Sequence, residues 1–176
     1  MENLFLTKAI VKRDVETVYE ALFLRSVTSF EAFLEELFIA ILQGSAQYPQ
    51  NRVSIRMTTK STDALMEILL QGDKYLDWLP FNKTESRAKL YLAHGRPFSE
   101  LDDAAKSKIK TIMYIRNAIA HKGHAVKVFQ EKVIGSQPLL PGEKKPAGFL
   151  RAPTNAGTVR FEIYIGEMAQ IASILC

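Results

Sequence analysis

The sequence is poor in cysteine and has no long apolar run. Its one cysteine, Cys176, is the last residue, which excludes a disulfide framework within the chain and suits a reducing compartment. No stretch approaches the roughly 20 apolar residues that cross a bilayer as a helix. The first residues, Met1-Glu2-Asn3, lack the basic and apolar segments of a secretory signal. These absences predict a cytoplasmic protein with no membrane-spanning segment.

The usual signatures of cofactor and nucleophile chemistry are also missing. There is no Gly-x-Ser-x-Gly elbow, no Gly-x-x-x-x-Gly-Lys phosphate loop and no Gly-x-Gly-x-x-Gly dinucleotide fingerprint. His121 and His124 have a spacing suited to two metal ligands, but no cysteine pair or acidic cluster near them supplies a third. We therefore expect no metal and no cofactor, so any catalysis would depend on side chains alone.

The composition is that of a globular protein, with 47% of the 176 residues apolar and 24% charged. This length is enough to bury a full core and predicts a single domain over residues 1–176. The net charge of +4 and the pI near 9.1 lean mildly toward anionic partners.

Four segments carry the three- and four-residue spacing of apolar side chains that is typical of amphipathic helices. They span residues 14–43, 59–71, 84–93 and 99–120. Asp14, Ser61 and Thr84 are the expected N-caps of the first three. Polar residues 44–60 read as a connection. We expect an all-α, up-and-down bundle of these four main helices, with its core at about residues 10–125.

An aromatic linker, residues 75–80, precedes the third helix and is expected to close one end of the bundle. Glu35 on the first helix is expected on a solvated face, and so is Arg87 on the third, with RNA contact as the alternative for Arg87. The bundle would thus have an apolar interior and a conventional charged surface.

The last fifty residues predict less regular structure. Val126, Val128, Val133 and Ile134 suggest a short strand or an extended arm. Residues 135–157 hold four prolines and four glycines and predict a flexible loop. Apolar residues alternate over 158–165, which predicts a strand, and residues 167–175 return to a helical spacing. We therefore expect irregular, possibly short-β additions at the C-terminal end.

Arg116 interrupts the apolar face of the fourth helix. On a wheel at about 100° per residue, it falls in the middle of a stripe formed by Ala105, Ile109, Ile112, Met113, Ile119 and Ala120. Burying an unpaired guanidinium is costly, so Arg116 must meet an anion or a wet cleft. Asn117 and His121 lie one turn apart on the adjacent flank, before the expected helix stop at Gly123. A fixed cation, an amide and an imidazole at a helix end suit a phosphate.

These residues carry a resemblance. Arg116-Asn117-Ala118-Ile119-Ala120-His121 resembles the Arg-x(4–6)-His motif of HEPN domains, which favour a polar residue directly after the arginine. Residues 29–37, Ser-Phe-Glu-Ala-Phe-Leu-Glu-Glu-Leu, are similar to the first long helix of that family. The resemblance covers about residues 10–125. It implies the same helical bundle and a homodimer in which two motifs face each other across a two-fold axis.

Catalytic HEPN domains are metal-independent endoribonucleases, and the resemblance implies that activity for this chain. His121 would act as general base or acid, Arg116 would hold the scissile phosphate, and Asn117 would orient one of them. The attacking group would be the 2′-hydroxyl of the RNA itself. The biological role implied is that of a prokaryotic toxin or defence effector, with a possible antitoxin or defence-system partner protein.

Four further residues complete the expected site. Lys110 lies on the same flank as Asn117 and His121 and is the expected phosphate-steering lysine. Lys106 and Lys122 would add RNA-binding charge, and Glu31 would support the arginine.

Two other classes of function fit the same residues. A non-catalytic HEPN-type module would bind RNA or nucleotide, or pair with a partner protein, without cleaving RNA. A purely structural helical dimer would instead satisfy Arg116 with an acid of the protein itself.

Overall fold

The protein is an all-α helical bundle, as predicted. The computed structural model describes residues 6–44 and 61–176. Within these ranges the chain forms seven α-helices and no strand, apart from one isolated antiparallel bridge between Pro153 and Val159. None of the helices in the described ranges is long and apolar enough to cross a membrane.

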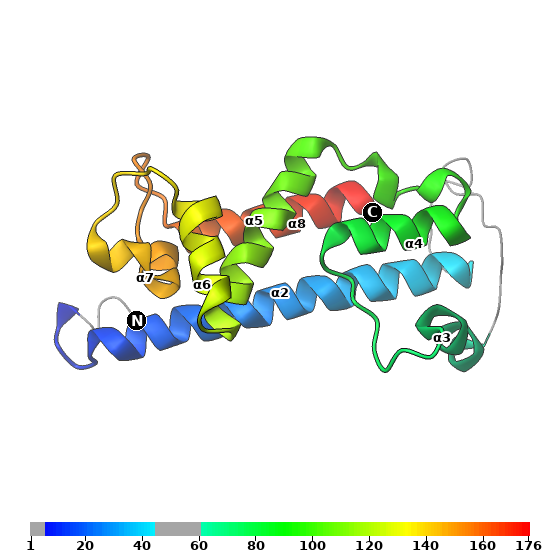
Figure 1. Ribbon diagram of the computed structural model, residues 1–176, viewed down its shortest axis with the longest axis horizontal. Helices are drawn as coiled ribbons and strands as arrows, with labels where there is room; N and C mark the ends of the chain where they lie inside the picture. Colours follow the sequence, from blue (N-terminus) through cyan, green and yellow to red (C-terminus); the bar gives the residue numbers. More distant parts are fainter. Residues whose placement is uncertain (1–5, 45–60) are drawn as a thin grey trace. The chain divides into compact units, whose positions relative to one another are not determined.

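Figure 1 shows the order of the elements along the chain. The α-helices are α2 (Lys12–Leu42), α3 (Thr62–Leu70), α4 (Phe81–Tyr91), α5 (Asp103–Ala120), α6 (His124–Phe129), α7 (Pro146–Arg151) and α8 (Arg160–Leu175). Short helical turns are η1 (Ala93–Gly95), η2 (Phe98–Glu100), the π-helical η3 (Gln130–Ile134) and η4 (Pro141–Lys144). Helices α2 to α5 correspond to the four predicted main helices. The predicted connection over residues 44–60 lies, beyond residue 44, outside the described residues.

The described residues fall into two compact units. The first contains the chain up to Thr28 and Thr111–Ala169, and the second contains Ser29–Lys110 and Gln170–Cys176. Helices α2, α5 and α8 therefore contribute residues to both units. The expectation of a single domain over residues 1–176 stays a prediction.

Of the predicted N-caps, only the one of α3 is confirmed. Ser61 is the N-cap of α3, as predicted, and its hydroxyl accepts a hydrogen bond from the Ala64 N–H at 3.3 Å. Asp14 is not the N-cap of α2, because the helix already begins at Lys12. Its carboxylate instead accepts a hydrogen bond from the Val11 N–H at 3.2 Å, which satisfies one of the free donors at the helix start.

The core of the second unit is built around Phe38. This ring is fully buried and lies 5.3 Å from the Trp78 ring, 5.5 Å from Phe98 and 6.4 Å from Tyr91, measured between centroids. Trp78 and Leu79, in the predicted aromatic linker, are buried as well. The end of the linker therefore forms part of this apolar core, and its closing of one end of the bundle stays a prediction.

Two charged residues expected on solvated faces are instead tied to Trp78. The indole N–H donates to the Glu35 carboxylate at 2.6 Å. The Arg87 guanidinium lies over the indole ring, 4.8 Å from its centroid, and donates to the Asp77 carbonyl at 3.2 Å. The prediction was wrong for both because a buried indole N–H requires an acceptor and its ring face attracts a cation.

Thr84 lies inside α4, because this helix begins earlier than predicted. It is not an N-cap but a fully buried residue within the helix, and its hydroxyl donates to the Trp78 carbonyl at 2.5 Å. The helix starts at Phe81, directly after Pro80. Proline fixes its own φ and so prepares the chain for a helix start.

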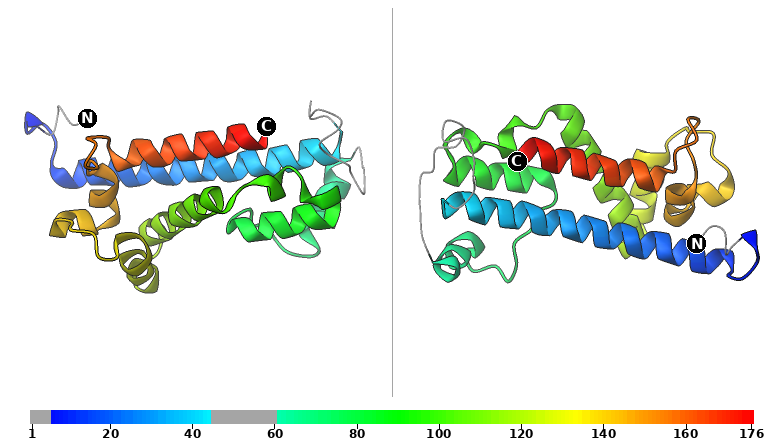
Figure 2. Two further views of the ribbon diagram at one scale, coloured as in Figure 1. Left: turned by 90° about the horizontal axis from the view of Figure 1, so that it is seen from above. Right: turned by 180° about the vertical axis from the view of Figure 1, so that it is seen from behind.

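In the first unit α8 lies alongside α2 (Figures 1 and 2). Phe161 packs edge-on against Tyr19, and Tyr164 packs edge-on against Phe23. The strand predicted over residues 158–165 is therefore wrong. Spacings of three and four residues join Phe161 and Tyr164 to Met168, Ile171 and Leu175, so the true period is helical and the short alternation was misleading.

The strand or extended arm predicted over residues 126–134 is also wrong. This segment forms α6 and the π-helical turn η3. Phe129 and Val133, one turn apart, are both buried, as is Ile134. The segment therefore buries one helical face, whereas a strand would point successive side chains to opposite faces.

The loop predicted over residues 135–157 contains two helical segments, η4 and α7. Pro141 and Pro146 stand in the first turns of these helices, where a missing N–H costs nothing, so the prolines start helices instead of breaking them. Phe149 is buried and contacts the rings of Phe129 and Tyr164. The prediction of an irregular loop is thus wrong for this part; its mobility stays a prediction.

The buried Phe149 forms a cluster with the half-buried Tyr164 and Arg160. The Arg160 guanidinium lies 4.8 Å from the centroid of the Phe149 ring and donates to the Ala152 carbonyl at 3.3 Å. Burial raises the pKa of the Tyr164 phenol to about 12, and the nearby Glu167 carboxylate acts in the same direction. The cluster holds α7 against the first turn of α8.

We predict opposite effects of alanine at two glycines of the first unit. A Cβ on Gly148 would clash with the carbonyl oxygen of Gly142 and lie 2.9 Å from its carbonyl carbon, whereas nothing lies within 4 Å of a Cβ on Gly166. Gly148→Ala should lower the free energy of unfolding by about 1–3 kcal/mol. Gly166→Ala should raise it by about 0.5–1 kcal/mol, because alanine loses less entropy in a helix. Urea denaturation followed by circular dichroism measures both, and equal effects of one sign would contradict the packing of α7 on η4.

Candidate functional site

The last turns of α5 place the predicted motif in the first unit. From Thr111 onward the buried residues are Ile112, Ile115 and Ala118, each three residues apart. Nearer its start, α5 buries Ala105 and Ile109. A spacing of three residues drifts around the helix by about 60° per step. The predicted stripe was therefore wrong in its second half, and Arg116 lies beside the buried face rather than in its middle.

Arg116 and Asn117 are joined directly. Both are half-buried, and the guanidinium NH1 donates to the Asn117 side-chain oxygen at 3.1 Å. No carboxylate among the described residues of the first unit lies within 4 Å of the Arg116 guanidinium. An amide oxygen neutralises no charge, so the cation keeps its full charge and its remaining N–H donors. That state favours an anionic ligand.

His121 follows directly after α5 ends at Ala120. Its backbone N–H donates to the Asn117 carbonyl at 2.9 Å, so Asn117 contacts Arg116 through its side chain and His121 through its main chain. The His121 side chain is exposed. Gly123, the predicted helix stop, has φ of 78°, a left-handed value that favours glycine, and it breaks the chain direction before α6.

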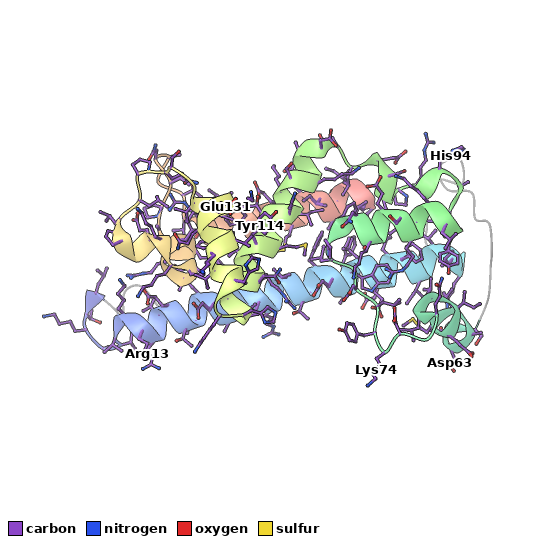
Figure 3. The ribbon with its side chains drawn as sticks, viewed as in Figure 1. Arg13, Asp63, Lys74, His94, Tyr114 and Glu131 are labelled. Carbon is purple, nitrogen blue, oxygen red and sulfur yellow. The ribbon has the colours of Figure 1, made fainter. Side chains whose placement is uncertain are left out.

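The connection between α5 and α6 is basic. Lys122, His124 and Lys127 are exposed. In the following turn, labelled at Glu131 in Figure 3, the Lys132 ammonium lies 2.6 Å from the Glu131 carboxylate. That hydrogen bond lowers the pKa of Glu131 and raises the pKa of Lys132. Lys122 is therefore exposed directly after His121, and its role in RNA binding stays a prediction.

The other three predicted residues belong to the second unit. Lys110 is exposed at the point where α5 passes between the units, and Glu31 is half-buried on α2. Lys106 lies 3.2 Å from the Glu85 carboxylate, which also pairs with Lys89 at 2.7 Å. Hydrogen bonds from Lys89 and then Lys106 lower the pKa of Glu85. Lys106 is thus already paired, and the roles of Lys110 and Glu31 stay predictions.

The residues available for a metal are few. Across residues 6–44 and 61–176, no three side chains of histidine, cysteine, aspartate or glutamate form a group that could hold a metal ion. His121 and His124 thus lack a third protein ligand within these ranges.

Each unit also contains a cavity that sequence patterns did not indicate. In the first unit a cavity of about 510 Å³ lies between the start of α2 and the segment from Leu140 to Val159, with Lys12, Glu16 and Arg151 in its wall. In the second unit a cavity of about 440 Å³ lies between the end of α3, the linker and α4. The wall of the first cavity combines segments that are distant in sequence, and the wall of the second combines several adjoining elements. The periodicity of residues within one helix therefore could not predict either cavity.

Comparisons with family models, with curated proteins and with solved structures find no match to this chain. The resemblance of residues 116–121 to the HEPN motif therefore stays a prediction. The function of the chain has to be inferred from the geometry of its own residues.

We predict that Arg116 and its neighbour Ile115 contribute very differently to stability. Ile115 is fully buried, so Ile115→Ala should lower the free energy of unfolding by about 2–5 kcal/mol. Arg116 is half-buried and has no salt bridge within its unit, so Arg116→Ala should change it by less than about 1 kcal/mol. Urea denaturation of the two variants checks this. A loss of several kcal/mol for Arg116→Ala would instead mark Arg116 as a structural residue.

Proposed function

We propose that the protein is a metal-independent endoribonuclease of the HEPN type, with its site at the end of α5. Arg116 binds the scissile phosphate, Asn117 orients the guanidinium through their hydrogen bond, and His121 transfers protons. Lys122 and Lys110 add charge that attracts the RNA backbone. The substrate is RNA, since its 2′-hydroxyl is the attacking group.

The observation that carries the proposal is a contrast between arginines. Arg87 and Arg160 each lie 4.8 Å from the centroid of an aromatic ring and each donate to a backbone carbonyl. Both have the partners of a structural arginine. Arg116 has neither a ring nor a carbonyl partner among the described residues of its unit, only the neutral amide of Asn117. Its charge is therefore available to a phosphate.

The reaction needs only groups that this site and the RNA provide. The 2′-oxygen attacks the adjacent phosphorus, and the bond from phosphorus to the 5′-oxygen breaks. His121 accepts the proton from the 2′-hydroxyl or donates one to the leaving 5′-oxygen, and water or the same residue of a second copy completes the other transfer. Arg116 stabilises the charge that accumulates on the phosphoryl oxygens. The products carry a 2′,3′-cyclic phosphate and a 5′-hydroxyl.

We predict that His121→Ala and Arg116→Ala each lower RNA cleavage by about 10²–10⁴-fold, because each removes a group that acts in the transition state. Purified protein is incubated with mixed cellular RNA, with and without EDTA, and the products are separated on gels. Asn117→Ala should lose less, since it removes only an orienting amide. His94→Ala, which removes a histidine of the second unit, is the matched control and should cleave normally.

Two results would overturn this mechanism. Full activity in His121→Ala would remove the proton-transfer role. Activity that disappears with EDTA would instead favour a metal held by His121 and His124.

A second candidate function is a non-catalytic module that binds RNA or nucleotide, or pairs with a partner protein. The observation that favours it is the His121 side chain, which is exposed and has no orienting hydrogen bond among the described residues of its unit. A general base is normally held in place by such a partner. This candidate predicts that wild-type protein retains RNA without cleaving it, and that Arg116→Ala weakens binding while His121→Ala does not.

The proposal includes a homodimer formed through the last turns of α5, as the family resemblance implies. Met113 and Ile119, half-buried beside Arg116, provide apolar surface for a second copy. In a cell, an antitoxin or a defence-system partner protein would regulate such a ribonuclease.

We predict a mass of about twice 19.8 kDa by light scattering at micromolar concentration. Ile119→Asp should shift the protein to monomer, because a carboxylate in an apolar interface is costly. Ile174→Asp changes a half-exposed isoleucine of the second unit and should leave the dimer intact. A monomeric wild-type protein would exclude a site composed of two copies.

A further inference from the structure

The cavity of about 440 Å³ in the second unit is lined by none of the residues of the proposed ribonuclease site. Its wall is formed by Gln71 at the end of α3, by the linker that follows, and by one face of α4. Figure 3 labels Lys74, on this linker directly before Tyr75. The volume lies within the range of small-ligand pockets.

Part of the apolar surface that lines the cavity is exposed. Tyr75 is 73% exposed and Leu90 is 56% exposed, although both line the cavity. Tyr91 adds a second phenol ring, whose oxygen accepts a hydrogen bond from the Gln71 amide at 3.3 Å. Of the two rings, Tyr75 provides an exposed flat surface on which a planar ring can stack.

The polar groups of the cavity are mostly neutral. The Asn82 amide and the Ser86 hydroxyl line it from successive turns of α4 and have no hydrogen bond to any other side chain in the described part of the chain. An amide offers both a donor and an acceptor, as a nucleobase edge does. These unpaired groups can therefore hydrogen-bond a ligand that carries both.

The charges of the cavity are balanced. Lys83 and Arg87 face Asp73 and Asp77, and the Lys83 ammonium lies 2.5 Å from the Asp77 carboxylate. Arg87 donates to the Asp77 carbonyl and lies over Trp78. Both cations are thus engaged within the protein. A phosphate would gain little here, whereas an uncharged ring would suffer no repulsion.

We propose that this cavity binds a single unstacked nucleobase, stacked on Tyr75 and hydrogen-bonded by Asn82 and Ser86. The base comes either from single-stranded RNA or from a free nucleoside, since both offer the same ring. Aromatic stacking combined with hydrogen bonds to base edges is how proteins recognise unpaired bases. The binding is independent of Arg116 and does not require that the protein cleave RNA.

The test measures binding of the four ribonucleosides by ligand-observed NMR, and of a short single-stranded RNA by fluorescence anisotropy. All measurements use Arg116→Ala protein, so that cleavage does not interfere. Tyr75→Ala should weaken binding about tenfold or more, which corresponds to the loss of one stacked base. Tyr75→Phe should bind normally, because stacking does not need the hydroxyl. Leu140→Ala, which truncates another exposed apolar side chain in the first unit, is the control.

Salt and an abasic RNA separate this site from phosphate binding. Nucleoside affinity should be nearly unchanged between about 50 and 200 mM salt, whereas phosphate-driven RNA binding falls steeply. An abasic RNA of the same length keeps every phosphate, and its binding should be insensitive to Tyr75→Ala.

The outcomes assign the source of the base or reject the site. Loss of nucleoside binding in Tyr75→Ala with RNA binding unchanged assigns the cavity to a free nucleoside. Weaker RNA binding in Tyr75→Ala, with or without nucleoside binding, assigns it to a base of RNA. If Tyr75→Ala changes neither ligand's binding, the proposal is overturned. Full ribonuclease activity in His121→Ala, which would overturn the proposed mechanism, would affect none of these results, so failure of the two proposals is distinguishable.

Discussion

The charge of a half-buried guanidinium must be compensated, and how the protein does so distinguishes its structural residues from its candidate functional ones. Arg87 is held by the Trp78 ring and the Asp77 carbonyl, and Arg160 by the Phe149 ring and the Ala152 carbonyl. Each organises the core of its own unit. Arg116 has only the Asn117 amide within its unit, which directs the guanidinium without neutralising it. We therefore predict that Arg116 contributes little to folding, and we propose that its charge serves to bind an anion.

The helices that the sequence predicted correctly are those with a long apolar period. Helices α2 to α5 have it, and Ser61 caps α3 as its sequence context indicated, whereas Asp14 and Thr84 are not the caps of α2 and α4. The segments assigned to the wrong class of secondary structure all lie after Gly123. There Phe161 and Ile163 alternate over too short a stretch to separate a strand from the helix α8. Pro141 and Pro146 start helices, because proline is tolerated in a first helical turn.

The candidate site was predictable where its residues are neighbours along one helix. Arg116, Asn117 and His121 needed only helix periodicity to be grouped, and the hydrogen bond between the first two follows from their adjacency. An ideal wheel could not foresee that the buried face of α5 drifts from Ile109 to Ala118, because that depends on which segments pack against each half. The helical wheel also could not predict that Lys106 forms an ion pair with Glu85. Contacts between side chains of different helices depend on the tertiary structure, which the periodicity of one helix does not specify.

The two proposed sites differ in the physical force that would bind a nucleic acid. At the end of α5 the exposed Lys122 and the uncompensated Arg116 make phosphate attraction the main term, which salt weakens. In the cavity beside α4 the cations are already engaged, and Tyr75 offers ring surface that salt does not affect. Phosphate attraction acts on every nucleotide alike, whereas stacking on Tyr75 depends on the base. A protein with both would therefore grip RNA without regard to sequence at Arg116 and acquire whatever base preference it has at Tyr75.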